Sequence, residues 1–219
     1  MPSLNARQQI VAYPHQHRYE LIRDGLKPLV NIASITGVIS FFDSEQKKAA
    51  IEATRHEWEA RGNACHLAAH KYWQHQKGVL SNGSTWAPEM GEFSAWIEPM
   101  LNHRLFRECK VIASEFSIFD EEYQISGTLD MLLWDPEKEK IILCDLKTQK
   151  NWNSRAYDTS KQLGGYVWLL ERNYQFEVDE CMTLYARPTV CTGKRSKLNI
   201  CKANWKTALE LYLEEQPSW

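Results

Sequence analysis

Two apolar runs joined by a short charged turn constrain this chain more than any other feature. The runs GTLDMLLW and IILCDLKT, at residues 127–134 and 141–148, flank the segment DPEKEK. A proline-containing charged turn between two apolar runs predicts a β-hairpin. If the turn is centred on its two middle residues, Asp130 lies directly opposite Asp145.

Such a pair needs a positive partner. Directly opposed carboxylates on adjacent strands lie about 5 Å apart and repel each other. A divalent cation would hold them together, and the backbone carbonyl of Leu146 could supply a further oxygen. Lys147 follows Asp145 by two residues, so it shares the same strand face. Asp-x-Lys alone would be explained by an ordinary ion pair, but with Asp130 opposite, the set predicts metal-assisted hydrolysis.

Length and composition indicate a single domain over residues 1–219. A net charge of −2 argues against nonspecific coating of nucleic acid, although the 26 Lys and Arg residues could form a local basic groove. No stretch is long and apolar enough for a signal core or a membrane span. The six cysteines form no Cys-x-x-Cys pair, so we expect free thiols and an intracellular, cytoplasmic location.

The first half of the chain reads as an arm followed by helices. Residues 1–28 are polar and irregular and are expected to form the arm, and residues 29–105 a mainly helical part. Ser44 is expected to cap one helix or a pair of helices ending at about Gln76, with a break at Gly62. The remaining expected elements are a loop at Ser81–Pro88 and a helix at Glu89–Asn102.

The second half, residues 106–219, reads as a sheet with closing helices. The expected strands are Cys109–Phe119, Tyr123–Trp134, Lys140–Lys147, Glu180–Arg187 and Ser196–Lys202. A loop at Asn151–Tyr157 is expected between them, with helices at Thr159–Arg172 and Asn204–Glu215. This order predicts an α/β fold with a central mixed β-sheet flanked by helices.

Other residues gain meaning only in combination. Glu115 is an acid among strand residues and could equally lie on the surface or in the site. His66 lies on a predicted helix, where a lone histidine is usually structural. Gln162 and Tyr166 share a helix face, and by themselves they would be a solvated residue and a core residue.

Taken together, these residues resemble the RecB-type exonuclease branch of the PD-(D/E)xK nuclease superfamily. The matching motifs are Arg61-Gly62 with His66, Gly127 to Asp130, Asp145 to Thr148, and Gln162 with Tyr166. They span about half of the chain, and only their order and spacing make them specific. The resemblance extends to compact phage recombination, mitochondrial genome maintenance and CRISPR-associated adaptation exonucleases. It implies a restriction-endonuclease-like core with an N-terminal helical extension.

The resemblance implies a DNA nuclease that depends on Mg²⁺ or Mn²⁺. In that family the histidine lies at or beside the metal, the two acids bind the metal, and the lysine assists the attacking water. The implied metal ligands are therefore His66, Asp130, Asp145 and Leu146, and the implied catalytic residues are Asp130, Asp145 and Lys147. The residues expected to line the site or contact DNA are Glu115, Gln162, Tyr166, Thr148, Arg61, Lys150, Arg155 and Lys161.

Several points stay open. Some RecB-type members hold an iron–sulfur cluster, but Cys181, Cys191 and Cys201 are spaced ten apart, so we expect none. The basic segment 193–197 could contact DNA or be a solvated turn. An arch formed by residues 45–76 would favour an exonuclease on single-stranded ends. The alternatives are an endonuclease, a DNA-binding or assembly module without cleavage, and an enzyme acting on another substrate. A phage origin and a replication or recombination partner are compatible with the sequence.

Overall fold

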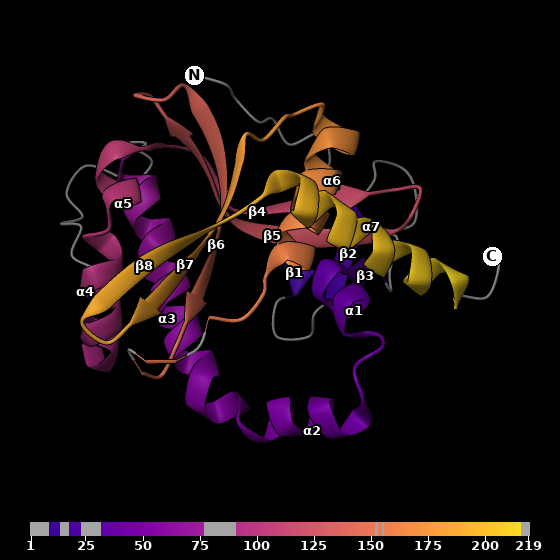
Figure 1. The fold of residues 1–219 in the computed structure, drawn as a ribbon, viewed down its shortest axis with the longest axis horizontal. Coiled ribbons are helices and arrows are strands. Elements are labelled where there is room, and N and C mark those ends of the chain that lie inside the picture. The colour runs from indigo at the N-terminus through magenta and orange to yellow at the C-terminus, as the bar shows by residue number, and fades with distance from the viewer. Residues whose placement is uncertain are drawn as a thin grey trace.

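A mixed six-stranded β-sheet with helices on both faces forms the protein (Figure 1), which confirms the expected α/β fold. The computed structural model describes residues 9–13, 18–22, 32–76, 91–151, 153–154 and 156–215. The helices are α1 Ile35–Ser40, α2 Glu45–Ala53, α3 Arg55–Gln76, α4 Ser94–Leu101, α5 Arg104–Glu108, α6 Ser160–Tyr174 and α7 Leu198–Glu214, with a 3₁₀ turn, η2, at Gly91–Phe93. The strands are β1 Gln9–Tyr13, β2 Arg18–Ile22, β3 Ala33–Ser34, β4 Lys110–Asp120, β5 Ile125–Asp135, β6 Lys140–Thr148, β7 Glu180–Arg187 and β8 Val190–Ser196.

Strand β5 organises the sheet. It pairs with β4 and β6 in antiparallel fashion and with the short β3 in parallel fashion. Strand β6 continues to β7 in parallel, and β7 forms a hairpin with the edge strand β8. The β5–β6 register pairs Asp135 with Lys140 and Met131 with Cys144, so the turn is centred as the sequence predicts.

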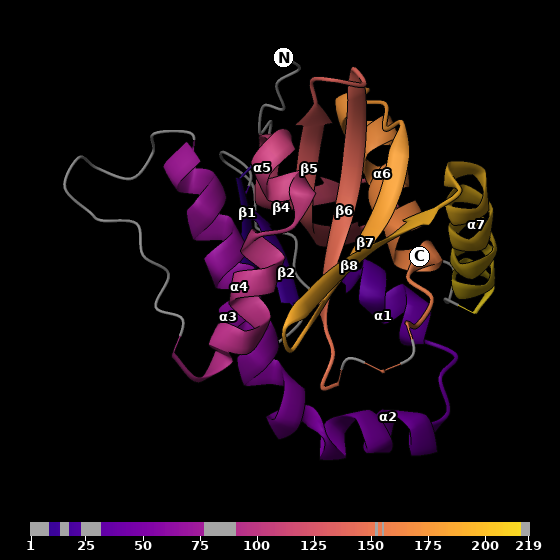
Figure 2. The same cartoon turned by 60° about the vertical axis from the view of Figure 1, so that its left-hand side comes forward.

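Two hydrophobic cores lie on opposite faces of the sheet (Figures 1 and 2). The first is formed with α1, α6 and α7 and includes Leu129, Leu132 and Trp205. The second is formed with α3, α4 and α5 and includes Met131 and Trp73. Side chains of β5 therefore supply both cores, as expected for a strand that is covered on each face.

Helices α6 and α7 approach each other closely at Gly164. A Cβ atom at this position would lie 2.0 Å from the backbone oxygen of Cys201, so no larger residue fits without moving a helix. No helix in the described ranges combines the length and the apolar composition that a membrane span requires.

The helical pair at residues 45–76 is confirmed, but its break lies elsewhere. Ser44 caps α2 by accepting a hydrogen bond from the backbone N of Lys47, as expected. The chain breaks at Thr54, and the prediction of a break at Gly62 is wrong, because Gly62 lies inside α3. A single helical glycine only weakens a helix, and the flanking residues of α3 are good helix formers.

Two other predictions from sequence need correction, and one helix was missed. The strand at Ser196–Lys202 is wrong: β7 turns directly into β8, and the following residues belong to α7, whose buried Cys201, Trp205 and Leu209 follow helical spacing. The short helix α5 was not predicted. The N-terminal arm contains two antiparallel strands, β1 and β2, and the expected loop at Ser81–Pro88 lies outside the described residues.

Candidate active site

Three acidic residues line up across three adjacent strands. The β5–β6 register, continued by one residue beyond Met131 and Cys144, sets Asp130 opposite Asp145. On the other side of β5, the pairs that flank Glu115 in β4 set it opposite Asp130. Asp130 and Asp145 therefore lie near each other just beyond the end of the ladder, as expected, with Glu115 as a third member of the row.

Asp130 lies where β5 and β6 separate. The β5–β6 ladder ends at Met131, whereas β6 continues to pair with β7 as far as Thr148. The backbone N of Leu146 donates a 2.6 Å hydrogen bond to Oδ2 of Asp130. The carboxylate thus takes the place of a strand partner and is fixed by backbone.

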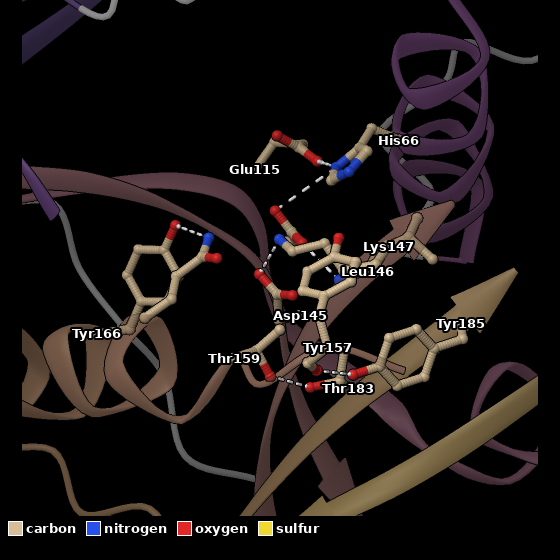
Figure 3. A network of polar contacts seen from close by, with 12 residues as sticks. His66, Glu115, Asp145, Leu146, Lys147, Tyr157, Thr159, Tyr166, Thr183 and Tyr185 are labelled. Atoms are coloured by element: carbon tan, nitrogen blue, oxygen red, sulfur yellow. Dashed lines mark hydrogen bonds and ion pairs between the residues drawn. The ribbon is translucent and has the colours of Figure 1, made fainter. Parts of the chain in front are cut away.

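Helix α3 brings His66 over this row of acids. Its Nδ1 lies 3.0 Å from Oε1 of Glu115 and 3.5 Å from Oδ1 of Asp130 (Figure 3). Glu115 has a left-handed backbone, with φ at 47°, which is uncommon for a non-glycine residue. The ligand atoms of the three residues lie within 4.8 Å of one another, which no other group of three His, Cys, Asp or Glu residues does in the described part of the chain.

Asp145 and Lys147 form the second half of the site. Lys147 Nζ donates a 2.7 Å hydrogen bond to Oδ1 of Asp145, whose side chain has no exposed surface. Oδ2 of Asp145 is buried and has no hydrogen-bond partner among the described residues. A buried carboxylate oxygen without a partner is costly, so this atom needs a ligand that the described residues do not supply.

Burial and charge together set the titration of the site. Burial raises the pKa of Asp130, and raises that of Asp145 to about 6. Burial alone would lower the pKa of His66, but the neighbouring carboxylates of Asp130 and Glu115 raise it to about 9. Burial opposes the charge of Lys147 as well, yet Asp145 and Asp130 raise the pKa of the lysine. The two cations therefore offset part of the negative charge of the acids.

The donor set fits a divalent cation. Carboxylate oxygens suit Mg²⁺ and Mn²⁺, and one imidazole is acceptable to Mn²⁺. Oδ2 of Asp145 is an oxygen available for such an ion, and His66 with Glu115 and Asp130 provides a cluster of the right size. Leu146 is buried between these acids.

Helix α6 presents the next pair of predicted residues. Tyr166 is buried in the core beside β5, and Nε2 of Gln162 donates a 3.1 Å hydrogen bond to the Tyr166 hydroxyl oxygen (Figure 3). A Cβ atom at Gly127 would lie 2.8 Å from the Tyr166 ring. Gly127 therefore leaves space for the ring of Tyr166, whose hydroxyl oxygen accepts the hydrogen bond from Gln162.

The basic residues expected at the site differ in burial and in their interaction partners. Arg61 is buried, donates to Thr148 Oγ1 at 3.2 Å, and lies over the ring of Trp96. Lys150 is exposed and forms a 2.9 Å ion pair with Glu57 of α3.

Lys161 is exposed and lines a hollow beside the site. Residues 193–196 belong to β8 rather than to a turn, and Arg195 pairs with Glu180 at 3.0 Å. Arg155 lies outside the described residues.

One residue near the site was not singled out from sequence. Tyr157 lies in the loop after β6, is 49% exposed, and is drawn beside Asp145 and Lys147 in Figure 3. Its place in the loop just after the Asp-Leu-Lys segment was the available signal.

Comparison with known proteins supports a nuclease. The family model described as "PD-(D/E)XK nuclease superfamily" matches residues 40–192, which contain the whole site described above. A solved structure titled "Crystal structure of SSO0001" is 16% identical, with a TM-score of 0.42, and the match covers 90% of this chain and 80% of that chain. No curated protein matches. Because the family model matches more than half of the chain, the chain belongs to the PD-(D/E)XK nuclease superfamily.

Proposed function

We propose that this protein is a divalent-metal-dependent deoxyribonuclease that degrades DNA from its ends and acts on single strands. The observation that carries the proposal is the row of Glu115, Asp130 and Asp145, with a lysine beside Asp145 and a buried Asp145 oxygen that has no partner in the part of the chain that the structure describes. Such a row in a superfamily of nucleases supports hydrolysis of a phosphodiester bond.

In this proposal the acids and the histidine hold the ion. His66, Asp130 and Asp145 would hold Mg²⁺ or Mn²⁺ together with the Leu146 carbonyl, and Glu115 would be a further carboxylate available to the ion. When bound, the cation lowers the pKa of a water molecule and offsets charge on the phosphate. The backbone N of Leu146 keeps the Asp130 carboxylate in place.

Lys147 has the catalytic role that requires a fixed positive charge. Its Nζ is held by Asp145, which orients it, and Asp145 and Asp130 keep it charged although its side chain is only 19% exposed. An ammonium in this position stabilises the negative charge that develops on the phosphate or on the attacking oxygen. Gln162 borders the neighbouring hollow and can donate to or accept from the strand.

The choice of exonuclease rests on the surroundings of the site. Helix α2 has no buried residue and spans the space between α1 and α3 at one end of the molecule (Figure 2). A hollow of about 360 Å³ opens beside it, lined by Asp43 and Lys47 at the start of α2 and by Gln162 on α6. A site bordered by such a bridge favours a strand that enters by its end.

A cleavage assay tests the proposal. Linear single- and double-stranded DNA labelled at the 5′ or 3′ end, a closed single-stranded circle and an RNA strand are incubated with Mg²⁺, Mn²⁺ or EDTA. Lys147→Met and Asp130→Asn are the test variants. Lys206→Met, which changes an exposed lysine of α7, is the matched control.

We expect metal-dependent loss of linear single-stranded DNA, unchanged in Lys206→Met and absent in both site variants. Cutting of the circle would make the enzyme an endonuclease. Binding of DNA without cleavage under either metal would favour a DNA-binding module instead. The label released first gives the polarity.

A further inference from the structure

Tyr157 separates two hollows on the surface beside the site. One, of about 360 Å³, extends toward α1 and α2, and the other, of about 540 Å³, extends toward β8. Tyr157 and Asp158 line both hollows, which makes this short stretch the divide between them. The Asp145 and Lys147 side chains lie beside the tyrosine (Figure 3), close enough to act on its hydroxyl electrostatically.

The tyrosine is held in place from behind. Its backbone oxygen accepts a 2.6 Å hydrogen bond from the Tyr185 hydroxyl, and the two rings meet edge to face with centroids 6.0 Å apart. The side chains of Thr159 and Thr183 are hydrogen-bonded to each other just beyond it. About half of Tyr157 is nevertheless exposed, so the protein fixes an aromatic residue without covering it.

The charges around Tyr157 suit a polyanionic strand. Lys161 lines the hollow on the α2 side and Lys194 the hollow on the β8 side, where they offset the carboxylate of Asp158, which lines both hollows. Burial raises the pKa of the Tyr157 hydroxyl to about 12, so the ring is neutral at working pH. A neutral aromatic surface with a lysine on each side is the arrangement that binds single strands, with bases on rings and phosphates on cations.

We propose that Tyr157 is the stacking platform for the base adjoining the scissile phosphate, so that the strand in the site must be unpaired there. The inference rests on the proposed nuclease function and adds the residue that selects single-stranded substrate. Two features distinguish it from a structural role: about half of the residue is exposed, and the hydrogen bond that anchors it uses the backbone rather than the hydroxyl.

The test compares three substitutions at this position. Tyr157→Phe keeps the ring, whereas Tyr157→Leu and Tyr157→Ala remove it, and Leu211→Ala is the control for an exposed apolar residue on α7. Binding is measured in a Lys147→Met background with Mn²⁺, using a single strand that carries 2-aminopurine near its end. Cleavage kinetics are measured in the otherwise unchanged enzyme, on intact strands and on strands with an abasic site at the same position.

We expect Tyr157→Phe and Leu211→Ala to behave as the parent protein. Loss of one stacked base should weaken binding about tenfold to a hundredfold in Tyr157→Leu and Tyr157→Ala. KM should rise by a similar factor with kcat nearly unchanged, and the quenching of 2-aminopurine should disappear. The parent protein should bind the abasic strand as weakly as Tyr157→Ala binds the intact strand. Tyr157→Ala should bind the abasic strand no more weakly than the intact one.

Equal losses of DNA-binding affinity in Tyr157→Phe and Tyr157→Ala would overturn the inference, since the hydroxyl and not the ring would then be responsible for binding. Unchanged KM and binding in both Tyr157→Leu and Tyr157→Ala would overturn it as well. In either case cleavage by the parent enzyme would leave the proposed function intact. If the parent protein neither binds nor cleaves DNA with Mg²⁺ or Mn²⁺, the proposed function fails and the inference fails with it.

Discussion

Metal binding at this site should compete with a proton on His66. The pKa of His66 is raised to about 9 by Asp130 and Glu115, and a histidine must be neutral to bind a metal. At pH 7 only about one site in a hundred has a neutral His66, and at pH 8 about one in ten. The Kd for Mn²⁺ should therefore fall about tenfold between pH 7 and pH 8.

Calorimetric titration of the protein with Mn²⁺ measures this directly. Repeating the titration in two buffers with different ionisation enthalpies counts the protons released, and we expect about one per ion at pH 7. In the His66→Gln variant, the Kd for Mn²⁺ should change little between pH 7 and pH 8. His56→Gln, which alters an exposed histidine of the same helix, should behave as the parent protein.

The same shift fixes the sign of the pH dependence of stability without metal. A pKa raised from 6.5 to about 9 means that the folded state binds the proton more tightly, so this contribution is full below about pH 6.5. It is lost as pH rises through 9. The pKa of Asp145, raised from 3.8 to about 6, makes stability fall with rising pH in the same way between those two values.

In the titration with Mn²⁺, a pH-independent Kd together with no proton release would refute the assignment of His66 as a ligand.

Three further changes test other parts of the reasoning. Lys147→Met should lower kcat by at least about a hundredfold in a cleavage assay while Mn²⁺ binding persists, since the lysine supplies charge rather than a ligand. Glu115→Gln should weaken Mn²⁺ binding and lower the pKa of His66, measured by NMR titration of the imidazole, because one of the two carboxylates that raise it is gone. Gly164→Ala should reduce the free energy of unfolding in urea by about 1–3 kcal/mol through its clash with Cys201, whereas Gly62→Ala, with open space around it, should increase it by up to about 1 kcal/mol.

Local sequence is enough to predict the hairpin and its register. Both strands are apolar on each side of a short turn, and a slip of one residue would move every side chain to the opposite face. The apolar pattern by itself therefore places Asp130 opposite Asp145, and the observed register, which ends one residue away at Met131 and Cys144, is the one predicted. The break between α2 and α3 is harder to locate, because glycine and threonine both weaken a helix and the sequence does not distinguish them.

Contacts between distant segments could not be predicted in the same way. Glu115 reaches His66, 49 residues earlier, because β4 shifts register near Val111 and then takes a left-handed backbone at Glu115. Neither feature has a clear sequence signal, since bulges depend on the neighbouring strand. Tyr157 was missed for a related reason: its importance comes from Tyr185, on a strand that follows α6.

The charges of the site explain why metal and substrate should bind in sequence. With their carboxylates ionised, Glu115, Asp130 and Asp145 contribute three negative charges, and His66 and Lys147 contribute two positive charges when protonated. The site without metal is therefore negative and repels a phosphate. Exchange of the His66 proton for a divalent ion adds one net positive charge and makes the cluster neutral. In this low-dielectric setting that single charge decides whether the DNA backbone can approach, so the ion should be needed for close binding of the strand as well as for its cleavage.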